Sequence, residues 1–161
     1  MTARRRKPAF PKASRSKAKA GGAKKKTPAT GGHPIMRHSA SDERLIERVR
    51  KLCMKLPEAN EKISHGEPTF FAGKGKVFAM IDGHHHNSPH LSVWLPQPFG
   101  AQEALIDADP ERFFRPPYVG VSGWVGVVLD TKPDWGVVEG LIRESYVHVA
   151  TGKLKKALLG S

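Results

Sequence analysis

Apolar residues recur at helical spacing in two segments of the chain. After Ser41 and Asp42 they stand three or four positions apart as far as Pro57, while charged residues cover the opposite face, which predicts an amphipathic helix that packs on other elements. Ser41 and Asp42 are expected to cap this helix, and Pro57 to end it. A second, long helix is expected after Asp134, whose side chain would cap it. The residues predicted to face inward are Leu45, Ile46, Val49, Leu52, Cys53 and Leu56 in the first helix and Val137, Val138, Leu141, Ile142, Tyr146 and Val149 in the second.

Between the two helices the period shortens to two, and glycine and proline interrupt short apolar runs. Strands are predicted over 69–72 and 76–81, joined by the turn Gly73-Lys74-Gly75, and over 90–95. Residues 61–65 are compatible with an additional strand. Residues 100–107 are expected to form a short helix and 110–114 a helical turn, followed by strands over 118–121 and 124–129.

The expected order is therefore helix, three strands, short helix, two strands and helix. Short strands joined by polar or glycine-rich turns favour an antiparallel sheet, and the two terminal helices would cover one of its faces. The predicted fold class is α+β, a two-layer sandwich. Its other sheet face would stay open, as a surface on which a ligand could bind.

Charge divides the chain near residue 41. Residues 1–41 hold 12 Lys and Arg and no acid, whereas 42–161 hold 15 residues of each sign, so the whole formal charge of +12 lies in the first quarter. That quarter has few apolar residues besides alanine, and its prolines and glycine pairs oppose regular structure. We expect residues 1–41 to form a disordered tail and 42–161 to form one folded domain.

An acid-free, lysine-rich segment neutralises phosphates and releases counterions, so the tail predicts DNA binding through the phosphate backbone with little sequence preference. A targeting peptide and a solubilising extension are the alternatives, although a transit peptide would need an amphipathic helix. The predicted hairpin turn, Lys132 and a small basic group near the end of the chain (Lys153, Lys155 and Lys156) are further candidates for phosphate contacts. The residues assigned to DNA binding are Arg4, Arg5, Arg6, Lys7, Lys12, Arg15, Lys17, Lys19, Lys24, Lys25, Lys26 and Arg37 in the tail and Lys74 and Lys76 at the turn.

Four histidines, His84, His85, His86 and His90, lie within seven residues. Imidazole is a common ligand of transition metals and carries charge when protonated. Because neighbouring residues of a strand point to opposite sides, however, the spacing does not assemble a metal site. We expect a solvated loop or a loop that contacts phosphate, and no metal.

Catalytic signals are weak. The segment 120–124 lacks the second glycine of a nucleophile elbow. Cys53 lies on the apolar stripe of the first helix, as a small core residue would. Trp94, Trp124 and Trp135 could stack on bases, but they stand in apolar segments and are expected in the core. The sequence therefore predicts a protein that is not an enzyme and needs no cofactor.

Six stretches after Pro57 stand out as a set. They are His65-Gly-Glu-Pro-Thr-Phe70, Lys76-Val-Phe-Ala79, Asp109-Pro-Glu-Arg-Phe-Phe114, Pro116-Pro-Tyr-Val-Gly120, Gly123-Trp-Val-Gly-Val127 and Asp134-Trp135. Together they resemble the MmcQ/YjbR family. The resemblance implies a frataxin-like α+β fold and a double-wing mode of DNA binding, and it supplies no catalytic motif. Frataxins bind iron through an acidic helix, but the first helix here mixes both charge signs, so iron delivery is not expected.

The chain has no apolar run of about 20 residues, no hydrophobic segment typical of a secretion signal, and one cysteine. These features favour a reducing compartment, the cytoplasm, with association to the nucleoid if the source is bacterial. The sequence thus predicts a DNA-binding protein. A module that binds a small ligand or a protein, with an incidental basic tail, is the alternative.

Overall fold

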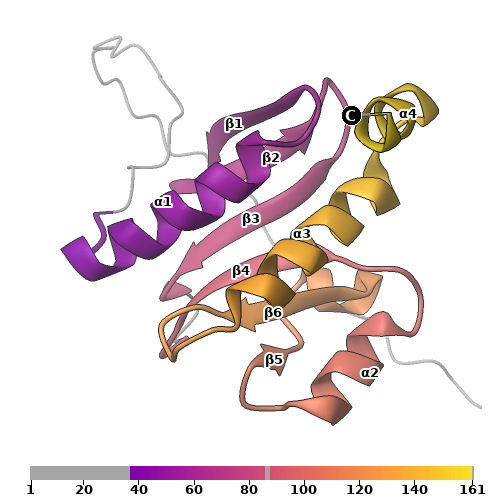
Figure 1. Cartoon of the computed structure of the whole chain (residues 1–161). Coiled ribbons are helices and arrows are strands. Elements are labelled where there is room, and N and C mark those ends of the chain that lie inside the picture. The colour runs from indigo at the N-terminus through magenta and orange to yellow at the C-terminus, as the bar shows by residue number, and fades with distance from the viewer. Residues whose placement is uncertain (1–36, 86–87, 161) are drawn as a thin grey trace, which may run out of the picture. The chain divides into compact units, whose positions relative to one another are not determined.

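The computed structural model describes residues 37–85 and 88–160. The predictions for residues 1–36 and for His86 lie outside this part of the chain. No helix among the described residues is long and apolar enough to cross a membrane. In chain order, the elements are α1 (Ala40–Met54), β1 (Ala59–Ser64), β2 (Glu67–Ala72), β3 (Val77–Gly83), β4 (Leu91–Pro96), α2 (Ala101–Ala108), β5 (Phe113–Phe114), the 3-10 helix η2 (Val119–Ser122), β6 (Trp124–Val128), α3 (Trp135–Val149) and α4 (Gly152–Leu159) (Figure 1).

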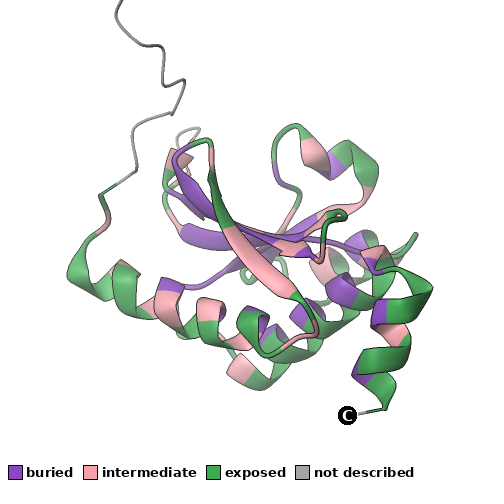
Figure 2. Ribbon diagram, turned by 90° about the horizontal axis from the view of Figure 1, so that it is seen from above, coloured by how far each residue is buried: buried purple, intermediate pink, exposed green. Residues whose placement is uncertain are grey.

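The strands form one antiparallel sheet in the order β1-β2-β3-β4-β6-β5. Helices α1 and α3 lie side by side on one face of this sheet, in front of it in Figure 1 and below it in Figure 2. The predicted class, an α+β two-layer arrangement, is confirmed. The helix that follows Asp134 begins as predicted, because the Asp134 side chain accepts hydrogen bonds from two backbone N–H groups of the first turn.

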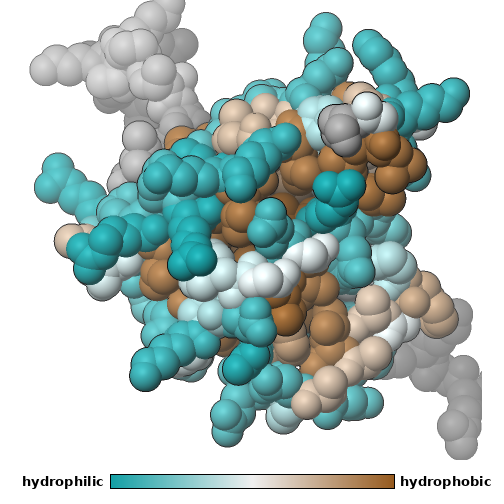
Figure 3. Space-filling model, viewed as in Figure 1, coloured by the Kyte–Doolittle hydropathy of each residue, from teal (hydrophilic) through white to brown (hydrophobic). Residues whose placement is uncertain are grey.

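The core lies between the sheet and these two helices. Ile46, Val49 and Cys53 of α1 are almost fully buried there, which confirms the apolar stripe read from the sequence. Phe78 of β3 meets Tyr146 of α3 edge to face, with ring centroids 5.2 Å apart. Figure 2 shows the buried positions in purple, concentrated on the sheet and on the sides of the helices that face it. Figure 3 shows the outer side of the helix layer, where hydrophilic side chains project around smaller apolar patches.

The start of α1 differs from the prediction. The helix begins at Ala40, and its cap is Ser39, whose hydroxyl accepts a hydrogen bond from the Asp42 N–H at 3.1 Å. The helix thus starts two residues before the expected boundary at Asp42. The cap predicted at Ser41 and Asp42 is therefore wrong, because Ser39 is also a capping residue type and the helix extends back to Ala40.

Two predictions between α2 and β6 need correction. The helical turn predicted over 110–114 is right for 110–112, where the Phe113 N–H donates to the Asp109 carbonyl, but residues 113–114 form the short strand β5, in which Phe114 pairs with Gly126 of β6. Residues 118–121 are not a strand, because Val119–Ser122 form η2, which ends at Gly123 in the left-handed conformation (φ +85°). A Cβ on Gly126 would lie 2.3 Å from the Phe114 ring, so the missing side chain makes room for that pairing.

The C-terminal region also contains a helix that the periodicity did not reveal. Helix α3 ends at Val149, and α4 starts afresh with Thr151 as its cap, accepting from the Leu154 N–H at 3.4 Å. Leu154 and Leu158 of α4 join the core. Val137, predicted to face inward, is 41% exposed, because the buried side of α3 begins at Val138, which is 1% exposed.

Candidate nucleic-acid interface

The antiparallel sheet has two chemically different ends. One end carries the β2–β3 turn with Lys74 and Lys76, and the other carries the β3–β4 loop with His84 and His85. We call them the basic end and the histidine end. The two loops that the sequence suggested as phosphate contacts are therefore separated by the full length of β3 and do not form a single contact edge.

Helix α4 lies at the basic end, beside the β2–β3 turn (Figure 1). A Cβ built on Gly73 would lie 3.3 Å from Leu154 Cδ1, and Gly73 itself has a φ of +60°. The Asn60 side-chain amide donates a hydrogen bond of 2.7 Å to the Gly73 carbonyl, which ties the start of β1 to the same turn. These contacts fix α4 against a turn about 80 positions earlier in the sequence.

The consequence is a cluster of lysines from two distant segments. Lys74 and Lys76 are exposed on the turn, and α4 adds Lys153, Lys155 and Lys156. Lys153 makes one weak ion pair with Glu58, at 3.8 Å and with both side chains largely exposed. The sequence offered both groups as separate candidates, and the structure brings them to one end of the domain.

A hollow of about 500 Å³ opens at the basic end. Its wall joins the start of β3, the end of β4, the start of β6 and the end of α3, so it exists only in the folded protein. A second hollow, of about 610 Å³, shares His148 with the first and adds Arg143, Glu144 and Lys155. The side chains that line the first hollow include Phe71, Lys76, Pro96, Ser122, Trp124 and His148.

The histidine end pairs its imidazoles with carboxylates. The Glu67 carboxylate, whose side chain is 5% exposed, accepts from His38 Nε2 at 2.8 Å and His85 Nε2 at 2.9 Å, and from the Gly83 N–H at 3.1 Å. His84 Nε2 lies 3.2 Å from an Asp42 oxygen.

The fourth position of the predicted histidine loop behaves in the same way. His90 Nδ1 lies 3.0 Å from an Asp130 oxygen, and the other oxygen of Asp130 accepts from the Leu91 N–H. Each of these described histidines thus lies beside a carboxylate, whose negative charge disfavours the loop as a phosphate contact. Lys132, also named as a candidate, follows Asp130 in the loop after β6 and belongs to this end.

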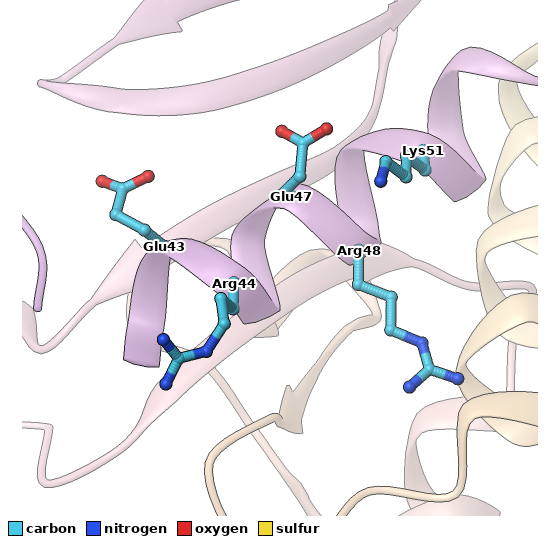
Figure 4. A pocket seen from close by; sticks show the side chains of 5 residues that line it. All are labelled: Glu43, Arg44, Glu47, Arg48 and Lys51. Carbon is cyan, nitrogen blue, oxygen red and sulfur yellow. The ribbon is translucent and has the colours of Figure 1, made fainter. Parts of the chain in front are cut away.

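No metal site is assembled by the described residues. Within 37–85 and 88–160, no group of three or more His, Cys, Asp or Glu side chains is arranged to hold a metal ion. Figure 4 shows the exposed side of α1, where the carboxylates of Glu43 and Glu47 point to one side and the guanidinium groups of Arg44 and Arg48 to the other. This surface is mixed in charge and does not form an acidic ridge.

The remaining candidates are settled by burial. Cys53 is fully buried, and burial raises the pKa of its thiol, so the side chain is a core residue without the reactivity of a thiolate. Trp94 is 6% exposed, as expected for the core. Trp135 is half-buried, with the Arg48 guanidinium 4.3 Å above its ring, and Trp124 is half-buried at the hollow. Of the predicted tail contacts, Arg37 is described and exposed.

Comparisons with known proteins agree with this architecture. A family model described as YjbR matches residues 54–148, more than half of the chain. The crystal structure of Deinococcus radiodurans protein DR2400, which carries a domain named DUF419, superposes with a TM-score of 0.57 at 23% sequence identity, covering 70% of this chain and 86% of that one. This likeness shows a shared fold. No curated protein matches the chain. The chain therefore belongs to the YjbR family.

Proposed function

We propose that this protein binds nucleic acid through the phosphate backbone, with little dependence on sequence, using the basic arm (residues 1–41) and the basic end of the domain together. The observation that carries the proposal is the segregation of charge. Twelve basic residues and no acid stand in the arm. Lysines of the β2–β3 turn and of α4 are gathered at one end of a domain that holds 15 basic and 15 acidic residues in total.

Both elements suit a polyanion. Each lysine or arginine that neutralises a phosphate releases a condensed counterion, and this release favours binding without reading the bases. The arm supplies most of the charge, and the basic end supplies a surface of fixed geometry that orients the domain. The domain as a whole is neutral, so attraction by its folded part depends on local placement and not on net charge.

The test is a titration of a fluorescent 20-base-pair duplex with the full chain across a salt series. We expect a plot of log K against log salt with a slope of about −6 to −10, from roughly −0.9 per neutralised phosphate. The double variant Lys74→Glu with Lys76→Glu is expected to make the slope shallower by about 2, because two phosphate contacts are lost. A shallow slope for the unaltered chain would overturn the proposal.

Lys132→Glu is the matched control, because it reverses one charge at the opposite end of the sheet. It should leave the slope nearly unchanged. Equal effects of the control and of the turn variant, per charge reversed, would mean that the basic end makes no specific contact. A chain beginning at Arg37 measures what the basic end contributes without most of the arm.

A module that binds a small ligand is the second candidate. The observation that favours it is the hollow of about 500 Å³ lined by Trp124 and Lys76. Its volume lies within the range usual for small-molecule sites.

A further inference from the structure

We propose that the hollow at the basic end takes an unpaired nucleobase stacked on Trp124, so that the protein prefers single-stranded over double-stranded nucleic acid. This inference rests on the proposed function and deepens it. The arm and the lysines attract the phosphates of single-stranded and double-stranded nucleic acid alike, and the hollow favours the single-stranded form.

The register of the sheet places the relevant aromatic rings on one face. Trp124 of β6 pairs with Pro96 of β4. Trp94 lies two residues before Pro96 on β4, and it pairs with Met80 of β3. Met80 pairs with Thr69, two residues before Phe71. Because side chains of paired residues, and of residues two apart, point to the same side, Phe71 and Trp124 share a face of the sheet.

That face is not the one covered by α1 and α3. Phe70, the neighbour of Phe71, is fully buried and belongs to the core formed with those helices. Phe71 and Trp124 are instead half-buried, and both line the hollow. The hollow lies at the end of the sheet, where His148 and Val149 of α3 also line it. The Lys62 ammonium lies 5.1 Å from the centroid of the Phe71 ring, so the stacking surface is assigned to the Trp124 indole.

The position of Trp124 is fixed by its backbone. Its carbonyl accepts a hydrogen bond from the Gln102 side-chain amide, and its strand is paired with β4. The other tryptophans are engaged elsewhere: the Trp94 indole N–H donates to Ser92 Oγ at 3.0 Å, and Arg48 covers the Trp135 ring. The backbone of Trp124 is therefore held in place before a base binds, which reduces the conformational entropy lost on stacking.

The charges around the platform complement a nucleotide. Lys76 and His148 line the same hollow as Trp124, and Lys74 stands two positions from Lys76 on the exposed turn. A base stacked on the indole would leave its phosphate among these cations. Aromatic platforms in a basic setting bind single strands in this way, whereas the faces of a base inside a duplex are already covered by its neighbours.

The experiment compares a fluorescent 15-nucleotide dT oligomer with a 15-base-pair duplex, both bound by the full chain at one salt concentration. Trp124→Leu removes stacking but keeps an apolar side chain, and is expected to weaken binding of the oligomer by about 5- to 150-fold, the range that corresponds to loss of one stacked base. Binding of the duplex should change less than about 2-fold. Trp124→Phe, which keeps an aromatic ring, should recover most of the loss.

Tryptophan fluorescence supplies a second readout. The oligomer should quench the emission of the unaltered chain and of Trp135→Phe, and should quench Trp124→Phe much less. Melting temperatures establish that each variant is folded, and the Trp124→Phe variant keeps the test decisive if Trp124→Leu does not fold.

Other results would overturn the inference. If Trp124→Leu binds the oligomer as tightly as the unaltered chain does, no base stacks in the hollow, even though a steep salt slope would leave the phosphate-binding proposal standing. If thymidine monophosphate quenches Trp124 while oligomer affinity is unaffected by Trp124→Leu, the hollow is a site for a small ligand. If neither oligomer nor duplex shows salt-dependent binding, the proposed function itself fails.

Discussion

Glu67 is a carboxylate buried in the sheet, and its surroundings are shaped to satisfy it. Two imidazoles, of His38 and His85, and the Gly83 N–H converge on its two oxygens. Burying a carboxylate without such partners costs free energy, so these three partners stabilise Glu67 in its buried position. Gly83 is required by crowding, because a Cβ there would lie 2.1 Å from His38 Cε1 and 2.6 Å from Glu67 Oε1.

Gly83→Ala should therefore lower the free energy of unfolding by about 1–3 kcal/mol, the usual cost of overpacking a tight site. In a His38→Ala background the additional cost should fall, because the nearest atom has been removed. Urea denaturation of the four chains in this cycle measures the coupling. An identical cost in both backgrounds would show that the crowding at His38 has no energetic consequence.

Tyr146 joins α3 to the loop after α1, since its hydroxyl donates a hydrogen bond of 2.5 Å to the Pro57 carbonyl. Burial, together with a smaller effect of Glu58, raises the pKa of this phenol. A pKa raised in the folded state means that the Tyr146 phenol ionises first in the unfolded chain as pH rises. The stabilisation that the protonated phenol gives the folded state is therefore complete below about pH 10 and is lost above it.

Tyr146→Phe should lower stability at pH 7 by about 1 kcal/mol, for one buried hydrogen bond, and should reduce the loss of stability between pH 9 and 11. Thermal melts over this pH range test both effects. Tyr118→Phe is the matched control, because Tyr118 is 76% exposed. A steep alkaline loss that persists unchanged in Tyr146→Phe would contradict the assignment.

At the scale of elements, α4 shows how a short helix can fix a distant turn. It buries Leu154 and Leu158, and Leu154 contacts the site of the Gly73 turn. Helix α1 is fixed in a comparable way by Arg50, which donates to both Glu61 of β1 and Glu47. The hydrogen bond with Glu61 is the main cause of the raised pKa of Arg50, so the guanidinium stays charged at every pH that the fold survives.

Leu154→Ala should destabilise the domain by about 2–5 kcal/mol, because it removes a buried side chain and leaves a cavity. Leu159→Ala on the same helix should change stability by less than about 0.5 kcal/mol, since Leu159 is 78% exposed. Hydrogen exchange adds a local readout: the Gly75 N–H, bonded to the Ala72 carbonyl, should exchange faster in Leu154→Ala. Unchanged exchange there would mean that α4 does not hold the turn.

At the scale of the molecule, residues before Asp42 take part in the fold. Every residue of the core cluster lies between Ile46 and Leu158. Ser39 and His38 nevertheless contribute to the fold, the first by capping α1 and the second by contacting Glu67. The domain that folds therefore extends beyond the boundary at Asp42 that charge and composition indicate.

A chain that begins at Arg37 should melt within about 2 °C of the full chain. A chain that begins at Asp42 should be less stable by about 1–3 kcal/mol, because it loses a helix cap and a hydrogen bond to a buried carboxylate. Differential scanning calorimetry of the three chains makes the comparison. Equal melting temperatures for the two shortened chains would place the boundary at Asp42 after all.

Local patterns were sufficient for much of the fold. The apolar period predicted the buried side of α1 at Ile46, Val49 and Cys53, and the glycine turn predicted the β2–β3 hairpin. Asp134 correctly marked the start of α3. These features depend on interactions between residues a few positions apart, so they can be predicted from the local sequence pattern.

Features that depend on distant partners were decided by the tertiary structure. Phe113 and Phe114 became a strand only because β6 offers an edge, with Gly126 leaving room for a ring. The lysines of α4 lie near those of the turn because Leu154 packs beside Gly73. These two residues are far apart in the chain, so no local periodicity predicts their contact.

The same division holds for the candidate site. Charge along the sequence determined that the arm is basic and the rest neutral, because composition is additive and needs no fold. The sequence could not show that Trp124, Lys76 and His148 line one hollow, since they come from three separate elements. Only the packing of the sheet against α3 brings them together. Burial of apolar surface determines how the sheet and the helix pack, and this packing determines where the polar residues at the edge of the core lie.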